Sequence, residues 1–401
     1  MCILTYSHIW SQESSGIKST SKIIKEIVKE IGDSRIVILG EPSHGDGAAF
    51  LFKTELVKYL HEKKGFNVIT WECGQYDMEI LDRSIADTLN MKVVEDKGML
   101  SFWKSNAQIR PLLNYIRETK NSKHPIRMAG FDPQLTAKDK MQWINAIIKF
   151  MQGSGIDLTR DSLDSRLYAG YKKIYFEKSG SGDELYLYSL LQKLDDLYDS
   201  NRRLIAEVNG NDMGEFMKES IKDQLVQRKY LAELLEKKTS FHVSMNNPRD
   251  QRMAENLVWQ SAKRFKTEKI IVWIASLHSL YEPELISDSS GVFRFQGFVS
   301  AGSIFKKAYP KEIYSLGFTA GEGSYGNTYM KTPVLLSPPP ESSIESSLLN
   351  NKKDYQFINF KTQEGLITTR FLGYEFFQAE WKRQLDGLVF IKKMVPCSLT
   401  D

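Results

Sequence analysis

Five short runs of aliphatic and β-branched residues, alternating with stretches of helical periodicity, constrain most strongly what this 401-residue chain can fold into. Each run is compact and bounded by turn residues, as is typical of a buried strand. The stretches between them carry apolar residues at three- and four-residue spacing, the pattern of amphipathic helices. This alternation predicts an α/β fold, a mainly parallel sheet flanked by helices. The predicted strands are residues 35–40, 67–72, 126–131, 270–275 and 313–318.

The alternation stops between residues 161 and 238, where leucines recur with helical spacing and no strand pattern occurs. A run of alternating small residues at 179–183 marks a turn inside this region. We therefore predict an α/β core formed by residues 1–160 and 239–401, which carries the active-site loops. Residues 161–238 are predicted to form a helical insert that walls the cleft. The insert contains no histidine, so we expect the catalytic groups to come from the core.

Composition excludes several classes of protein. Basic residues number 54 and acidic residues 50, and this small, dispersed excess argues against a nucleic-acid or membrane partner. The three cysteines are too few for a disulfide framework and too far apart for a CxxC metal clip. The N-terminus lacks the pattern of a secretory signal, and no apolar run is long enough to span a bilayer. We therefore expect a cytoplasmic protein, whose oligomeric state the sequence leaves open.

Polar residues follow four of the five predicted strands at the ends where ligands bind in open parallel sheets. Glu41 and His44 follow the first strand, Glu72 ends the second, Asp132 follows the third and His278 the fourth. Only six histidines occur in the chain, so two at strand ends are notable. We predict that these side chains share one site at the carboxyl edge of the sheet.

The pairing of carboxylates with histidines indicates acid–base chemistry. A carboxylate beside an imidazole fixes the ring tautomer and raises its basicity, which suits a general base that deprotonates water. Glu41 and Glu72 are both candidates for the partner of His44. A histidine near a strand end is also often a packing residue, and this interpretation stays open for His278. Asp132 stands before a proline and is equally typical of a turn.

The loop that contains His44 is rich in small residues but lacks a hydrolase nucleophile. Ser43 is not in the Gly-x-Ser-x-Gly elbow of α/β-hydrolases, because Glu41 stands where the first glycine should be. Cys73 has no neighbouring base in the sequence and is better interpreted as a buried filler. Three glycines are expected to let the backbone turn sharply and approach a ligand closely: Gly40, Gly45 and Gly47.

Residues 37–45, Val-Ile-Leu-Gly-Glu-Pro-Ser-His-Gly, resemble the opening motif of the erythromycin esterase family, which includes macrolide-resistance hydrolases. Residues 65–72 resemble the family's strand that ends in an acid, and residues 249–256 its Arg-Asp-x-x-Met-Ala-Glu-Asn helix start. The strand before His278 and a later Gly-Phe pair complete the set. The pieces occur in family order and span roughly residues 20 to 390.

The resemblance implies that an activated water hydrolyses a carboxylic ester or macrolactone, with no covalent intermediate, metal or other cofactor. His44 would be the general base, and Glu41 and Glu72 would orient it or the water. His278 and Arg252 would bind or polarise the ester, since the tetrahedral intermediate develops an oxyanion. The predicted substrate-binding residues are Arg252, Lys53 and Asp132. The implied partner is a small ester or lactone, and the implied role is macrolide resistance.

Two positions depart from the family pattern. Ala275 stands where family members commonly have a first histidine, and Lys53 stands where an arginine is frequent in resistance enzymes. Lysine and arginine are not equivalent at a bidentate site. Two alternatives therefore stay open. One is a metal-dependent hydrolase that uses the same glutamates and histidines as nitrogen and oxygen ligands. The other is a non-catalytic relative that only binds a small molecule.

Overall fold

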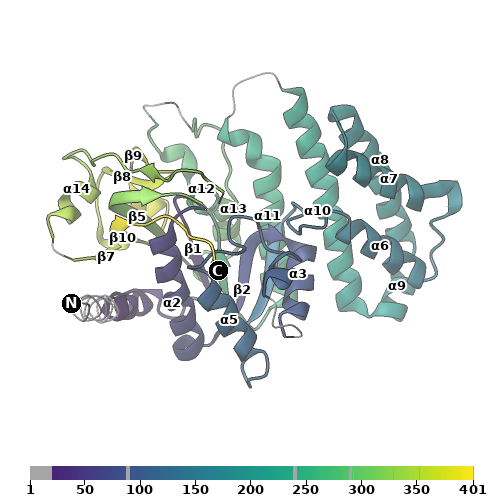
Figure 1. Cartoon of the computed structure of the whole chain (residues 1–401), viewed down its shortest axis with the longest axis horizontal. Helices are drawn as coiled ribbons and strands as arrows, with labels where there is room; N and C mark the ends of the chain where they lie inside the picture. Colours follow the sequence, from purple (N-terminus) through teal and green to yellow (C-terminus); the bar gives the residue numbers. More distant parts are fainter. Residues whose placement is uncertain are drawn as a thin grey trace, which may run out of the picture.

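The computed structural model describes residues 20–86, 91–237, 242–288, 291, 293–327, 329–351 and 353–400. A mainly parallel sheet runs through the middle of the molecule (Figure 1). Its strand order is β3-β2-β4-β1-β5-β10-β7, and neighbours pair in parallel except β10 (Gly387–Met394) with β7 (Tyr355–Asn359). The five predicted strands are confirmed: β1 (Ile36–Leu39), β2 (Phe66–Gly74), β3 (Arg127–Asp132), β4 (Lys269–Trp273) and β5 (Ile313–Tyr325).

The sheet is buried on both faces because successive side chains of each strand point to opposite sides. Val37 and Leu39 of β1 belong to one hydrophobic cluster, and Ile36 and Ile38 belong to another on the opposite face. Because both faces of such a strand are buried, it has apolar residues at every position and forms a continuous aliphatic run in the sequence. This explains why β1 was recognisable without any alternation of polar and apolar residues.

Helices cover both faces of the sheet. The first cluster contains residues of α2 (Gly47–Lys64), α3 (Gln75–Ser84), α5 (Arg110–Thr119) and the helix at residues 20–31. The second contains residues of α11 (Asn247–Trp259) and α13 (Ala301–Ala308). The remaining helices near the sheet are the short α4 (Met91–Glu95), α12 (Ser276–Ser279) and α14 (Ile344–Leu349). The predicted α/β class is therefore confirmed.

Helices gather at one end of the molecule, beyond β3, in the part of the chain between β3 and β4 (Figure 1). They are α6 (Gln142–Gly153), α7 (Leu163–Phe176), α8 (Ser181–Ser200), α9 (Arg202–Asn209) and α10 (Asn211–Glu236). A separate hydrophobic cluster joins them. The predicted helical region exists, and α6, which precedes residue 161, shares its core. Its role as a wall of the cleft stays a prediction.

Short strands build the opposite end of the molecule (Figure 1). They are β6 (Val334–Leu335), β7 (Tyr355–Asn359), the hairpin of β8 (Ile367–Leu372) and β9 (Glu375–Ala379), and β10 (Gly387–Met394). The hairpin turns at Gly373 and Tyr374, whose φ angles are 59° and 63°. A tyrosine in this left-handed region is unusual because its Cβ crowds the backbone. Within the described residues, no helix has both the length and the apolar character needed to cross a membrane.

Candidate functional site

Four neighbouring strands bring the predicted polar residues to one edge of the sheet. β1, β4, β2 and β3 lie side by side and run in parallel, so their carboxyl ends open on the same side. The pairing of β2 with β3 becomes irregular between Trp71 and Gly74, at the position of Glu72. Such irregularities re-aim side chains and are common beside active sites. A charged cluster forms at this edge, with His44 on one side and His278 on the other.

His44 is paired with Glu41. Its Nδ1 lies 2.9 Å from Oε1 of Glu41, so the ring is oriented by a carboxylate from its own loop. The ring stacks on Phe102 at a centroid distance of 4.9 Å and meets Trp103 edge-on at 5.5 Å. Its side chain is 29% exposed, whereas that of Glu41 is fully buried. Within the described part of the chain, Glu41 is the hydrogen-bond partner of the ring, and Nε2 is left for a water or substrate.

Glu41 is a buried anion with three hydrogen-bonding side chains around it. Besides His44, Lys53 Nζ donates to Oε2 at 2.6 Å, and Trp103 Nε1 donates to Oε1 at 3.2 Å. Lys53 also lies 4.0 Å from the ring centroid of Trp273. Burial lowers the pKa of Lys53, and the charge of Glu41 opposes that shift. A buried carboxylate is stable only when paired in this way, so Lys53 is the partner that allows Glu41 to stay buried.

The electrostatic balance favours proton uptake by His44. Burial lowers its pKa, but the hydrogen bond and charge of Glu41, with a further contribution from Glu72, outweigh that effect. The pKa therefore lies above the ordinary value of 6.5. Because Glu72 and Arg249 both act on this pKa, the two sides of the cluster are electrostatically connected.

Arg249 links the charged residues on the His278 side of the cluster. Its Nη2 donates to Glu72 Oε1 at 2.9 Å and to Asp132 Oδ2 at 2.5 Å, and its Nε donates to Asp132 Oδ1 at 3.2 Å. Nη1 lies 3.2 Å from Nε2 of His278. The guanidinium thus joins a residue near the end of β2, the last residue of β3 and a residue that follows β4. It comes from the first turn of α11, which contacts β3.

His278 is held by an acid that sequence analysis did not select. Its Nδ1 lies 2.8 Å from Oδ1 of Asp250, which also accepts a hydrogen bond from the backbone N–H of Ala301. Nε2 faces Arg249 and lies 3.7 Å from Glu72 Oε1. Burial lowers the pKa of His278, but Asp250 and Glu72 together raise it above its ordinary value.

Glu72 connects the two sides as a permanent anion. Burial raises its pKa, but the charges of His278, Arg249 and His44 and a hydrogen bond from Ala275 lower it to about 2. That backbone N–H donates to Oε2 at 2.8 Å. A carboxylate with so low a pKa is a poor proton acceptor at neutral pH. Glu72 is therefore suited to orienting cations and not to carrying protons.

The predicted substrate-binding residues are placed differently from the predicted catalytic ones. Lys53 and Asp132 lie in the cluster, but both are buried and already paired, with Glu41 and Arg249 respectively. The structure does not bring Arg252 to the cluster. Its guanidinium pairs with Asp223 and Glu219 of α10, at 2.7 Å each. Arg252 begins the next turn of α11 and packs that helix against α10.

Two of the loop glycines lie against the protein's own backbone. A Cβ on Gly45 would lie 2.6 Å from the backbone of Gly326, and one on Gly47 would lie 2.6 Å from the carbonyl oxygen of Pro396. Neither glycine has a positive φ. They allow the loop to approach the protein's own C-terminal segments, because no side chain fits between the two backbones. Gly45 lies in a turn of the loop, and the approach of these glycines to a ligand stays a prediction.

Sequence reasoning missed Arg249, Asp250, Phe102 and Trp103. A signal for Arg249 existed, because buried acids such as Glu72 and Asp132 need a cation. Arg249 also opens the motif at residues 249–256, so it could have been chosen on that ground. No local pattern announced the two aromatic residues, which reach His44 from the segment between α4 and α5. Their contact depends on how that segment crosses the sheet edge.

The cluster does not have the arrangement of a metal centre. Within the described ranges, no group of three or more histidine, cysteine, aspartate or glutamate side chains is placed to hold a metal ion. The histidines lie on opposite sides, and cations from Lys53 and Arg249 are already bonded to the carboxylates between them. The carboxylates of Glu41 and Glu72 are thus occupied by internal ion pairs.

The fold and the cluster define an α/β protein with a histidine–carboxylate site at the carboxyl edge of a parallel sheet. The chain belongs to the erythromycin esterase family, whose model, described as Erythromycin esterase, matches residues 61–394. The matched range begins after the loop that carries Glu41 and His44. It includes Glu72, Arg249 and His278.

Relatives of known sequence or structure support the family and the fold. The Bacillus subtilis (strain 168) protein named "Putative hydrolase YbfO" is 26% identical over 419 residues, which cover 96% of this chain and 90% of that protein. A Bacillus cereus protein of known structure superposes with a TM-score of 0.73 at 20% identity, over 94% and 93% of the chains. A mutant of the erythromycin esterase EreC in its open conformation superposes with a TM-score of 0.68 at 14% identity, over 94% and 95%. At these identities the structures show a shared fold.

Proposed function

We propose that this protein hydrolyses the carboxylic ester bond of a small molecule, an open ester or a lactone, with a water that His44 activates. The observation that carries the proposal is the pairing of His44 with Glu41 at 2.9 Å on a half-buried ring whose Nε2 is left open. A fixed tautomer with a free second nitrogen is the arrangement that a general base needs.

The proposed steps use this pairing. Nδ1–H of His44 donates to Glu41, so the lone pair of Nε2 accepts a proton from water as that water attacks the ester carbonyl carbon. The imidazolium that forms is stabilised by the buried anion Glu41. When the tetrahedral intermediate collapses, the same proton passes to the leaving alkoxide. The products are a carboxylic acid and an alcohol, and the enzyme returns to its starting state.

Arg249 is the best placed group to stabilise the oxyanion. It carries a positive charge beside His278, and its side chain is 13% exposed while the side chains of its acidic partners Glu72 and Asp132 are nearly or fully buried. Preorganised donors of this kind are often the largest contribution to catalysis of acyl transfer. His278, held by Asp250, supplies a second polar group on the same side. In this assignment Arg249 takes the role that the sequence analysis gave to Arg252.

Family membership supports ester hydrolysis, and one structural neighbour, EreC, is itself named an erythromycin esterase. A role of this chain in macrolide resistance is part of the proposal. The test is incubation with a panel of macrolides, simple lactones and open esters, followed by mass spectrometry. We expect at least one compound to gain the mass of one water. No turnover of any ester, together with saturable binding that raises the melting temperature, would instead identify a non-catalytic binding protein.

Two further measurements separate this mechanism from its alternatives. Activity is expected to survive exhaustive chelation and to be unchanged by added zinc or manganese. Loss of activity on chelation and its recovery with either ion would indicate that His44 is a metal ligand and not the general base. Ser43→Ala and Cys73→Ala are expected to retain substantial activity, because neither side chain is a proposed nucleophile. An acyl group detected on the intact protein by mass spectrometry would contradict direct attack by water.

A further inference from the structure

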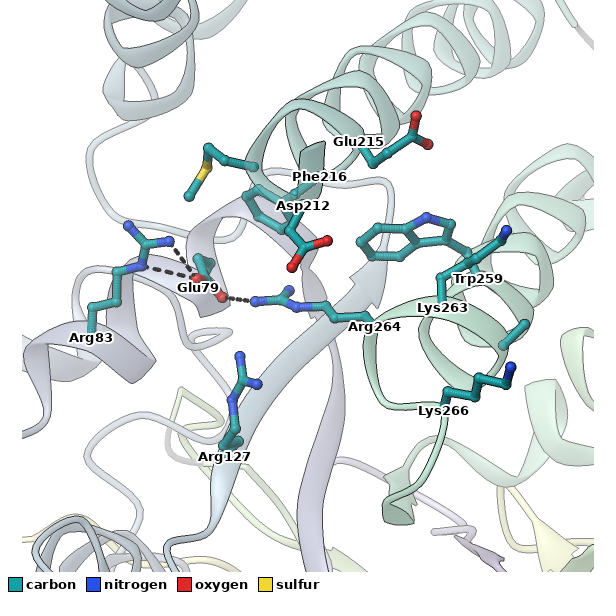
Figure 2. Close-up of a pocket in the computed structure, with 12 residues that line it drawn as sticks. Glu79, Arg83, Arg127, Asp212, Glu215, Phe216, Trp259, Lys263, Arg264 and Lys266 are labelled. Carbon is teal, nitrogen blue, oxygen red and sulfur yellow. Dashed lines mark hydrogen bonds and ion pairs between the residues drawn. The ribbon is translucent and has the colours of Figure 1, made fainter. Parts of the chain in front are cut away.

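A second polar cavity lies at the other end of the sheet from the His44 cluster. Its volume is about 680 Å³, within the range typical of small-molecule sites. Arg127, the first residue of β3, lies on its floor, whereas the proposed active site lies at the carboxyl ends of the strands. The other walls come from α3, the start of α10 and the end of α11 with the turn that follows (Figure 2). No part of this cavity belongs to the catalytic cluster described above.

Two arginines in this cavity are held close together by aromatic rings. The guanidinium carbon of Arg127 lies 4.9 Å from the ring centroid of Phe265, and that of Arg264 lies 5.2 Å from the same centroid. Arg264 also packs on Phe216 at 4.8 Å. Figure 2 shows Arg83, Arg127 and Arg264 around the carboxylate of Glu79. Stacking fixes the guanidinium planes, so little conformational entropy remains to be lost when a ligand binds.

Glu79 does not neutralise these arginines by itself. Glu79 forms ion pairs with both Arg83 and Arg264, which leaves an excess of one positive charge in that group. Among the described residues, Arg127 has no acidic partner within ion-pair distance. Burial lowers the pKa of Arg264 most strongly, Glu79 opposes that shift, and the neighbouring charge of Arg127 lowers the pKa further. The folded protein therefore holds the positive charges of Arg127 and Arg264 close together at some cost in free energy.

Hydrogen-bond donors in the same cavity also lack acceptors. Nη1 of Arg264 and Nε1 of Trp259 are buried, and neither has a hydrogen-bond partner among the residues that the structure describes. A buried donor without an acceptor costs free energy, so a native site that keeps one calls for an explanation. Arg264 ends a π-helical turn, Gln260–Arg264, and such turns are frequent at functional sites. Every unmet group named here is a donor, which indicates a ligand rich in acceptor oxygens.

The overall charge of the lining indicates how negative that ligand is. Five of the lining residues are basic and three are acidic, an excess of two positive charges. The acids other than Glu79 lie on α10, on the opposite wall from Arg127 (Figure 2). Lys263 and Lys266 add charge near the α11 side. An anionic group with two negative charges would balance the site. Two oxygens of such a group can accept parallel hydrogen bonds from the forked donors of an arginine.

We propose that this cavity binds the phosphate group of a small organic phosphate monoester, with Arg127 and Arg264 as its principal ligands. The cavity is much larger than a phosphate ion, and Trp259 and Met213 supply apolar surface for the organic part. The monoester is therefore bound more tightly than inorganic phosphate. This site is independent of the proposed hydrolysis, because it shares no residue with the His44 cluster.

The test is isothermal titration of the whole protein with phenyl phosphate, inorganic phosphate and benzyl alcohol. We expect saturable, one-to-one binding of phenyl phosphate, weaker binding of inorganic phosphate and none of the alcohol. Arg127→Gln should weaken binding by about tenfold or more, since it removes a charge-assisted hydrogen bond. Arg127 is exposed, so this variant is expected to fold. The matched control is Arg117→Gln on α5, which removes one positive charge away from the cavity and should leave binding unchanged.

Each result decides for or against the site. Absence of saturable heat with both phosphates would overturn the proposal, as would equal binding by Arg127→Gln and the parent protein. Equal weakening by the two arginine variants would reveal only a general effect of net charge. His44→Ala is expected to bind phenyl phosphate as tightly as the parent. Loss of binding in His44→Ala would place the phosphate in the catalytic cluster and contradict the second site.

Discussion

His44 is the residue on which the proposed chemistry depends most directly. Its replacement by alanine should reduce the rate of ester hydrolysis by about 10²–10⁴-fold, the usual contribution of a general base. The melting temperature should change little, because the ring is partly exposed and, among the residues that the structure describes, its one hydrogen-bond partner is Glu41. His124→Ala, which removes an exposed histidine outside the cluster, is the control and should keep full activity. Comparable activity of the two variants would exclude His44 as the base.

Glu41 sets the pH range in which His44 can work. Only the neutral ring accepts a proton, so kcat/KM should fall as the pH drops through the pKa of His44. Glu41→Gln removes the hydrogen bond to a carboxylate and the negative charge that raise this pKa, whereas burial continues to lower it. The acidic limb of the pH profile should therefore move to lower pH, with a smaller maximum.

The control for Glu41→Gln is Glu55→Gln, which changes an exposed side chain on α2. The acidic limb of its pH profile of kcat/KM should stay where it is in the parent protein. A limb that stays fixed or moves to higher pH in Glu41→Gln would show that another group controls the rate.

The two arginines of α11 are predicted to have separable roles. Arg249→Lys keeps the charge but loses the forked contacts with Asp132 and Glu72, so kcat/KM should fall by about 10²-fold or more. Arg252→Lys disturbs the ion pairs to α10, so it should lower the melting temperature and leave kcat/KM nearly unchanged. Kinetics and thermal unfolding of both variants check this. Equal losses of kcat/KM in the two variants would show that Arg252 also takes part in the reaction.

At the scale of elements, the hairpin of β8 and β9 contacts the loop that carries Glu41 and His44. The N–H of Gly373 donates to the carbonyl oxygen of Pro42 at 3.2 Å, and the hydroxyl of Tyr374 lies 2.7 Å from Oδ1 of Asp46. Asp46 in turn accepts a hydrogen bond from the backbone N–H of Ser43 at 2.7 Å. The strained backbone of Tyr374 is consistent with a position dictated by this contact.

Tyr374→Phe tests the hairpin contact without changing the turn. The phenylalanine keeps the ring packed against Tyr325 but releases Asp46, so the loop before His44 loses one constraint. We expect kcat to fall by up to about 10²-fold with little change in KM, because small misplacements of a catalytic group are costly. Tyr325→Phe is the control, since no hydrogen bond of its hydroxyl is present among the described residues. Unchanged kcat in Tyr374→Phe would assign the contact to stability alone.

At the scale of the whole molecule, Asp46 makes stability depend on pH. Burial raises its pKa to about 8, against the lowering effects of Tyr374 and Ser43. The folded state therefore holds a proton that the unfolded chain releases near its ordinary pKa of 3.8. The stability contributed by this proton is complete below that value and is lost as the pH rises towards 8.

Asp46→Asn removes this dependence, because the amide can accept from Ser43 and donate to Tyr374 without a charge. Its melting temperature, relative to that of the parent, should increase between pH 5 and pH 8. Thermal unfolding of both proteins at several pH values measures the difference. A difference that is independent of pH would mean that Asp46 is ionised in the folded protein throughout this range.

Local sequence determined the secondary structure and the edge of the sheet where the charged groups lie. A strand buried on both faces must be continuously apolar, so β1 to β5 could be recognised from a few residues each, and Glu41, His44, Glu72, Asp132 and His278 could be placed at their ends. The helical region between β3 and β4 was equally visible, because leucine periodicity is a local property.

Tertiary structure alone decided which charges meet. Sequence spacing left Glu41 and Glu72 as equal candidates for the partner of His44. The bend of the loop brings Oε1 of Glu41 to 2.9 Å from Nδ1 of His44. The start and direction of α11 decide that Arg249, not Arg252, reaches the sheet edge, because a residue one turn along a helix lies about 5 Å further along its axis. Lys53 is buried beside Glu41 because α2 packs on the sheet, where Lys53 lies over the ring of Trp273. Such long-range pairings carry no local periodicity, so composition and spacing could not reveal them.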